Sequence, residues 1–267
     1  MLYLSAIISA FFAVISGVTN LSAGLNLIWI IPLTFVSTYI SLILLLFLVT
    51  FIILLFVDVN KPVKPSRTFR FIIKLVLDVL VPLFRVKIHS TGLNKVPYNT
   101  RILLVSNHLF DVDPAVFMHA MPNLEIGFVG KKEIYSDMKL VSRAMHLLGG
   151  LPIDRENPRN AVNTINKSAE NIKNDICSMG IFPEGYCSTT GELLPMRNGA
   201  FKIAKKAECP IVVATVKNTR KVLNNMFRRT TDVYLDILTV IDKETVDKLS
   251  TAELGNMVYE IMLNNLK

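Results

Sequence analysis

Charge is absent from the start of this chain: no Asp, Glu, Lys or Arg occurs from Met1 to Val57. A soluble surface almost never extends so far without an ionised side chain, and a helix that spans a membrane needs only about 20 apolar residues. We therefore expect this region to lie in a bilayer. The same absence argues against a cleaved signal peptide, because no Lys or Arg precedes the first apolar segment.

Cysteine is scarce as well, with three residues in 267. Cys177, Cys187 and Cys209 lack the paired spacings of a zinc site, so neither a disulfide framework nor a metal site is expected. The formal net charge is +8, but no basic stripe with interleaved aromatic residues indicates nucleic acid. Membrane lipids and a phosphate-bearing substrate are the expected partners, and nucleic acid is not.

The charge-free region contains two apolar segments, Tyr3 to Val18 and Leu27 to Val57, with a polar break at Gly17 to Asn26. They predict a transmembrane hairpin or anchor over residues 1–59. The first segment is short for a span, so a re-entrant piece before one long helix stays open. Basic residues follow the second segment, and the positive-inside rule then places the chain after Asn60 in the cytoplasm; these residues are Lys61, Lys64, Arg67, Arg70 and Lys74.

Residues 60–82 read as a proline-broken linker followed by a basic juxtamembrane amphipathic helix that Pro82 ends. Polar side chains recur there at spacings of three and four, which forms one stripe; they are Arg67, Arg70, Lys74 and Asp78. A helix at the membrane interface and a core helix of the following domain both fit this pattern.

Residues 83–267 alternate apolar runs of strand length with helical periodicities. Strands are expected at 84–89, 101–105, 126–129, 179–182, 210–216 and 232–240. The clearest helix runs from Pro158 to Cys177, and a capping-box pattern at Ser250 to Glu253 begins the last one. The alternation predicts an α/β domain with a mostly parallel sheet flanked by helices.

A histidine and a carboxylate stand five residues apart directly after the apolar run that ends at Val105. His108 is a general-base candidate, and Asp113 would fix its tautomer and stabilise the imidazolium ion. Because Asp113 precedes Pro114, a helix N-cap explains it too. Both interpretations hold together if a turn brings the two side chains into contact.

Two later segments carry further candidates. Gly149 to Arg155 joins a glycine turn to an arginine whose planar fork suits phosphate oxygens. Taken alone, Asp154-Arg155 is more often a surface ion pair. Phe182 to Gly185 places Glu184 in a rigid turn after a strand, where carboxylates commonly face a ligand crevice. From these four residues alone, a plain solvated turn is the favoured interpretation.

Taken in order, four blocks resemble the glycerolipid acyltransferase family, and within it the bacterial 1-acyl-glycerol-3-phosphate acyltransferase branch. The blocks are Asn107-His108 with Asp113, Gly150 to Arg155, Phe182 to Gly185, and Pro210 to Val216. The resemblance implies a membrane enzyme of phospholipid biosynthesis that acylates lysophosphatidic acid to phosphatidic acid. The donor would be acyl-CoA or acyl-carrier protein, without any cofactor.

The resemblance also implies roles for particular residues. His108 would deprotonate the acceptor hydroxyl and Asp113 would orient it, while Arg155 would hold the acceptor phosphate. The remaining substrate-binding candidates on this basis are Asn107, Glu184, Gly185, Lys131, Lys132 and Arg197.

The chain departs from the family pattern after Phe-Pro-Glu-Gly, where Tyr186 and Cys187 replace the usual Thr or Ser and Arg. Val213 or Ala214 also stands where the fourth block usually has a second proline. An acyltransferase for another lyso-lipid is therefore the second hypothesis, and a non-catalytic module that binds anionic membranes is the third.

Overall fold

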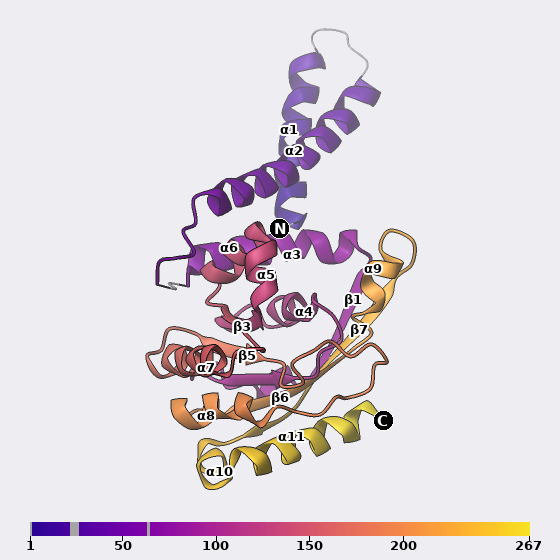
Figure 1. The fold of residues 1–267 in the computed structure, drawn as a ribbon. Helices are drawn as coiled ribbons and strands as arrows, with labels where there is room; N and C mark the ends of the chain where they lie inside the picture. Colours follow the sequence, from indigo (N-terminus) through magenta and orange to yellow (C-terminus); the bar gives the residue numbers. More distant parts are fainter. Residues whose placement is uncertain (1, 22–26, 63–64) are drawn as a thin grey trace.

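The computed structural model describes residues 2–21, 27–62 and 65–267, and its first two helices form a hairpin (Figure 1). They are α1 (Leu2–Leu21) and α2 (Leu27–Leu55). Small residues on one face of α1 are its buried positions, and a Cβ atom on Gly17 would lie 2.9 Å from Ile31 Cδ1 of α2. Small residues let two helix backbones approach closely, so this stripe sets the packing of the hairpin; it consists of Ser5, Ser9, Ala13 and Gly17.

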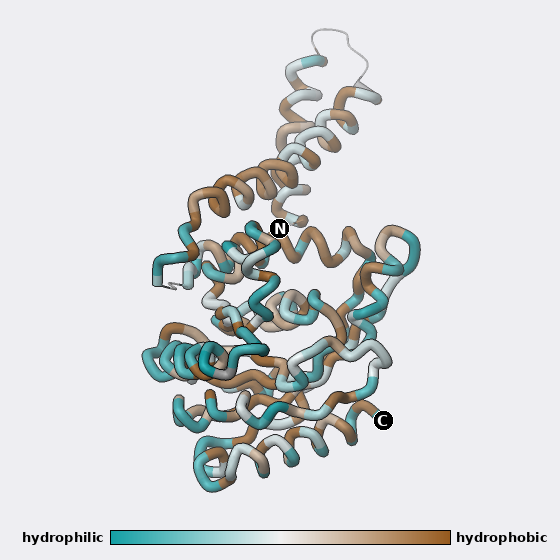
Figure 2. The backbone as a smooth tube through the Cα atoms, viewed as in Figure 1, coloured by the Kyte–Doolittle hydropathy of each residue, from teal (hydrophilic) through white to brown (hydrophobic). Residues whose placement is uncertain are grey.

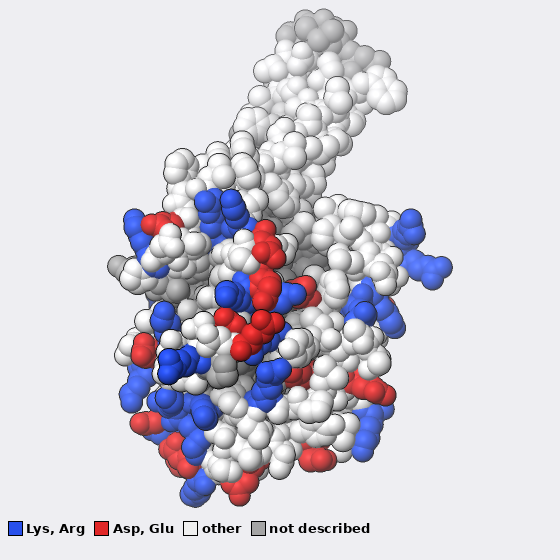
Figure 3. Space-filling view, in the orientation of Figure 1, with Lys and Arg blue, Asp and Glu red and all other residues white. Residues whose placement is uncertain are grey.

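The polar break begins later than the sequence indicates, because α1 continues through Gly17 to Leu21. The rest of that break, residues 22–26, lies outside the described residues, as does Lys64. Both helices are long and apolar enough to cross a membrane. Figures 2 and 3 show the hairpin as apolar and without charge, whereas Lys, Arg, Asp and Glu gather on the rest of the molecule.

The remaining chain forms a sheet of seven strands among the described residues, in the order β1-β7-β6-β2-β5-β3-β4. All neighbouring strands are parallel except β6 and β7, which confirms the mostly parallel sheet. The strands are β1 (Val86–Thr91), β2 (Leu103–Ser106), β3 (Ile126–Lys131), β4 (Leu151–Ile153), β5 (Ser178–Ile181), β6 (Ile211–Lys217) and β7 (Thr231–Ile241).

Helices cover both faces of the sheet because successive strand side chains point to opposite sides. Leu103 and Val105 pack with α7 (Pro158–Lys173), α8 (Lys202–Ala207) and α11 (Thr251–Leu266). Ile102 and Leu104 pack with α4 (Asp113–Ala120) on the opposite face. The shorter elements are α5 (Lys132–Asp137), α6 (Lys139–Leu147), α9 (Lys221–Asn225), α10 (Lys243–Lys248) and 3-10 turns at Leu93–Lys95 and Asn198–Phe201.

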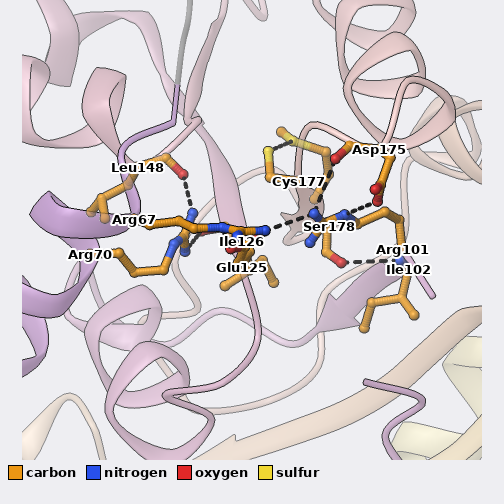
Figure 4. A network of polar contacts seen from close by, with 11 residues as sticks. Arg67, Arg70, Arg101, Ile102, Glu125, Ile126, Leu148, Asp175, Cys177 and Ser178 are labelled. Carbon is orange, nitrogen blue, oxygen red and sulfur yellow. Dashed lines mark hydrogen bonds and ion pairs between the residues drawn. The ribbon is translucent and has the colours of Figure 1, made fainter. Parts of the chain in front are cut away.

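The juxtamembrane helix α3 (Arg67–Leu83) contains Pro82 and ends one residue after it. Its polar stripe faces the α/β domain: Arg70 donates to the carbonyl oxygens of Ile126 and Leu148, and Arg67 pairs with Glu125 at 2.6 Å (Figure 4). Apolar side chains of α2 pack against α3 and α6 in two clusters. Helix α3 therefore joins the hairpin to the sheet through contacts on two of its faces.

Candidate active site

The site lies where several parallel strands end. Because β2, β3, β4 and β5 run in one direction, their carboxyl ends meet at one edge of the sheet, where α/β proteins commonly bind ligands. His108 follows β2 by two residues, Lys131 ends β3, and Arg155 follows β4 by two residues. Residues distant in sequence thus become neighbours.

His108 and Asp113 are in direct contact, as the sequence predicts. His108 Nδ1 donates to Asp113 Oδ2 at 2.7 Å, since an ionised carboxylate only accepts hydrogen bonds. The same oxygen accepts the backbone N–H groups of Leu109 and Phe110 at 2.8 and 3.0 Å. The N-cap interpretation of Asp113 is wrong, because Val112 occupies the cap and Asp113 is the first residue of α4. Its side chain folds back over the preceding turn instead.

An aromatic stack also fixes the His108 ring. The ring stacks on Phe182 with ring centroids 4.2 Å apart, and Phe182 stacks in turn on Phe128. Burial lowers the pKa of His108, but hydrogen bonds and charges at Asp113 and Cys187 outweigh this and raise it to about 9. The ring orientation is therefore set, and with it the position of Nε2. The raised pKa makes the imidazole a stronger base than a free histidine side chain.

Asn107 and Glu184 support the site from behind. The Asn107 side chain bonds both the N–H and the carbonyl of Val216, at 2.8 and 3.0 Å, and so ties the end of β2 to β6. Glu184 accepts the backbone N–H groups of His108 and Leu194 at 2.6 and 2.7 Å. Burial raises the pKa of Glu184 to about 7. Neither side chain lines the cavity beside His108. Both residues therefore hold the surrounding backbone in place, and the predicted substrate contact is not seen for either.

A cavity of about 1330 Å³ opens beside His108. This exceeds the roughly 300–1,000 Å³ of most small-molecule sites. One part is apolar and lies among α3, α4, α5 and α6, with lining that includes Ile73, Met118, Ile134, Val141, Ala144 and Leu148. The other part is basic and is lined by Lys131, Arg155, Arg197, Lys202, Lys206 and Arg220. His108 lies on the wall of the same cavity.

Arg155 and Arg197 meet at Tyr186, which sequence reasoning left without a role. Their guanidinium carbons lie 5.1 and 5.3 Å from the centroid of the Tyr186 ring, within cation–π range. Burial lowers the pKa of Arg155, and the charge of Arg197 adds to that effect. Among the described residues, neither arginine forms an ion pair with a carboxylate. Two adjacent guanidinium groups that form no salt bridge with the described carboxylates favour an anion at this place.

Gly185, in the turn after β5, leaves the space that the Arg197 side chain occupies. Gly185 has a φ of 78°, and a Cβ atom there would lie 2.7 Å from Arg197 Nε. A side chain at this position would displace the guanidinium, so Gly185 shapes the basic part of the cavity as expected. Lys131 lines the cavity, whereas Lys132 lies outside it and pairs with Asp154 at 3.2 Å.

Residues 87–217 match the family model described as Acyltransferase. This stretch holds His108 and Asp113, both arginines and strands β2 to β6. This stretch of the chain is an acyltransferase-family domain.

Particular relatives sharpen this classification. The chain is 30% identical to the 1-acyl-sn-glycerol-3-phosphate acyltransferase of Saccharomyces cerevisiae over 207 residues, which cover 76% of this chain and 65% of that protein. It is 26% identical to the protein of the same name from Haemophilus influenzae, over 68% of this chain and 75% of that protein. The matched stretch covers 43% of a chloroplastic relative from Brassica napus, so the chain spans less than two thirds of the first curated relatives.

A solved structure shares the fold over the whole chain. The 1-acyl-sn-glycerophosphate (LPA) acyltransferase PlsC from Thermotoga maritima has a TM-score of 0.59 and 17% identity, with 100% of this chain and 96% of that chain covered. This similarity shows the fold, and the family model together with the curated relatives confirms the resemblance to the glycerolipid acyltransferases.

Proposed function

We propose that this protein transfers a fatty acyl group from an acyl thioester to the free hydroxyl of 1-acyl-glycerol-3-phosphate, which gives phosphatidic acid. The observation that carries the proposal is one cavity that joins three features: a buried His–Asp pair, a pair of arginines that form no salt bridge within the described part of the chain, and an apolar branch. The names of the relatives support the same acceptor.

His108 acts as the general base in this scheme. Its Nε2 accepts the proton of the acceptor hydroxyl while the oxygen attacks the thioester carbonyl carbon. The tetrahedral oxyanion then collapses, the carbon–sulfur bond breaks, and the imidazolium ion returns the proton to the departing thiolate. Asp113 stabilises the imidazolium through the 2.7 Å bond to Nδ1 and keeps Nε2 directed at the cavity. A base of this kind contributes about 10²–10⁴ in rate.

The two ends of the cavity suit the two ends of the acceptor. A phosphate dianion is complementary to Arg155 and Arg197, each of which offers several N–H donors. The acyl chain takes the apolar branch, whose lining residues Ile73, Met118 and Leu148 also belong to the cluster that packs against α2. Lipid thus enters next to the hairpin.

The second hypothesis, another lyso-lipid acceptor, rests on the missing arginine at position 187. Arg197 supplies that charge from a different segment, since it shares the Tyr186 ring with Arg155. A phosphate monoester therefore remains the favoured headgroup. The donor is acyl-CoA or acyl-carrier protein, and no cofactor takes part in the proposed chemistry.

The proposed location is the cell membrane. Helices α1 and α2 would integrate into the bilayer and leave the α/β domain on the cytoplasmic side, where Lys61 and the basic start of α3 follow the second span. Protease treatment of sealed vesicles with known orientation tests this placement. Protection of the α/β domain in vesicles that expose the cytoplasmic face would contradict it.

The test of function is acyl transfer by the purified full chain in detergent, with acyl-CoA and acyl-carrier protein offered to a panel of lyso-lipids. His108→Ala should lower the rate by at least about 10²-fold while the thermal unfolding midpoint stays within a few degrees. Arg155→Gln and Arg197→Gln should each raise KM for the phosphate acceptor, and Lys132→Gln, outside the cavity, is the matched control. Preference for an acceptor without phosphate, or full activity of the alanine variant, would overturn the proposal.

A further inference from the structure

Three side chains with metal-ligating atoms meet on the wall of the cavity: His108, Asp111 and Cys187. Their ligand atoms all lie within 4.8 Å of one another, and Cys187 Sγ is 3.8 Å from Asp111 Oδ1. Two of the residues belong to the loop after β2 and the third to the loop after β5. Since β2 and β5 are adjacent parallel strands, the fold brings these loops together.

His108 is already held as a metal ligand would be. Its Nδ1 atom is bonded to the Asp113 carboxylate, so Nε2 is the nitrogen that remains, and the stack on Phe182 sets the ring plane. Histidines that bind metal ions almost always donate their other N–H to a carboxylate or carbonyl in this way. Because the Asp113 bond and the Phe182 stack already fix the imidazole, the His108 side chain need not reorient to bind a cation.

The donor set selects the ion. Imidazole nitrogen, thiolate sulfur and carboxylate oxygen together suit Zn²⁺, whereas Mg²⁺ and Ca²⁺ prefer oxygen ligands alone. Three protein ligands leave a fourth, open position of a tetrahedral site. Asp111 is exposed and Cys187 half-buried, and both line the cavity, so an ion has access.

We propose that Zn²⁺ binds to His108, Asp111 and Cys187 and inhibits the enzyme. The ion takes the Nε2 lone pair that must accept the hydroxyl proton, so acyl transfer stops while the metal is bound. The inhibitory consequence rests on the proposed function, but the binding site does not. Cys187 gives the site its affinity for zinc, and an arginine at this position would repel the cation.

Binding is tested with metal alone, using the purified full chain after treatment with a chelator. Co²⁺ should produce a thiolate-to-metal charge-transfer band that Zn²⁺ displaces. The band should vanish in Cys187→Ser and weaken in Asp111→Asn, and it should persist in Glu192→Gln, which removes an exposed carboxylate from the same loop. Cys177 and Cys209 are buried in the core, away from this cluster. Absence of the band, or its persistence in Cys187→Ser, would overturn the site.

Inhibition is measured separately in the acyl-transfer assay. The Zn²⁺ concentration for half-inhibition should rise by at least roughly 10-fold in Cys187→Ser, the lower end of what loss of a supporting group alone does to metal affinity. Mg²⁺ at the same concentrations should have no effect. Equal zinc sensitivity of wild type and Cys187→Ser would refute the inference. A cobalt band in a chain that transfers no acyl group would refute the proposed function and leave the metal site standing.

Discussion

The substitution Asp113→Asn removes the negative charge next to His108, the proposed general base, and changes little else. Asp113 is fully buried, and its Oδ2 atom accepts three hydrogen bonds, from His108 Nδ1 and from two backbone N–H groups. Asparagine has nearly the same shape and keeps one acceptor oxygen, so the turn can be retained. What it lacks is the negative charge that stabilises the imidazolium ion.

The magnitude follows from the pKa of His108, which is about 9 against an ordinary 6.5. This difference corresponds to about 3 kcal/mol of net stabilisation of the protonated ring. The stabilisation is felt in the transition state, where the proton has reached Nε2. Loss of most of it should lower kcat/KM by roughly 10²-fold, at about 1.4 kcal/mol for each factor of ten.

The pH dependence supplies a second, independent readout. Because the raised pKa keeps His108 protonated below about pH 9, wild-type kcat/KM should rise with pH and level off near 9. The groups that face the ring are Asp113, Cys187, Asp111 and the buried Glu184. In Asp113→Asn the plateau should begin at a lower pH and at a lower rate, so the deficit is larger at pH 9 than at pH 7. A variant with the wild-type profile and plateau would refute the reasoning.

Three further perturbations test other parts of the structure. Glu125→Gln should lower stability by about 1–2 kcal/mol at pH 7. Burial raises the pKa of Glu125, but Arg101 and Arg67 outweigh this and lower it below 4.5, so the deficit should be full above pH 4.5 and should shrink in thermal unfolding as the pH falls through the lowered pKa. Tyr186→Leu should raise KM for the phosphate acceptor several-fold and Tyr186→Phe should not, because the ring face holds the two guanidinium groups; equal KM values in steady-state kinetics would contradict this. Gly180→Ala should destabilise by roughly 1–3 kcal/mol, since its Cβ would lie 2.4 Å from the Phe128 ring; calorimetry that shows an unchanged midpoint would contradict this.

Much of the fold is readable from local patterns. The strand predictions agree with the structure to within two residues at each end, and the capping box of Ser250 and Glu253 is present. Strand β4 was not predicted as a strand, because three residues carry too little periodicity. The strand order and the reversal at β7 depend on contacts between distant segments, so no local pattern encodes them.

Some residues of the candidate site could likewise be predicted from the sequence, and others could not. His108 and Asp113 are readable because they directly follow a predicted strand, whereas the role proposed for Arg155 came from the family resemblance, since β4 was not predicted. The roles of Asn107 and Glu184 are not, since they depend on which backbone groups the neighbouring strands and loops present. The partnership of Arg197 with Arg155 likewise arises only when the glycine turn folds it over Tyr186.

Helix α3 has a mechanical consequence. Arg70 grips the start of β3 and the end of α6 on one side, while α2 packs on the same helix and on α6 through apolar clusters. The hairpin is thus connected to the sheet by a packed helix and not by a flexible linker. A packed helix couples the orientation of the two parts. If α2 tilts to match a thicker or thinner bilayer, the α/β domain and its cavity tilt with it. Catalytic rate should then respond to bilayer thickness even when the lipid headgroups are unchanged.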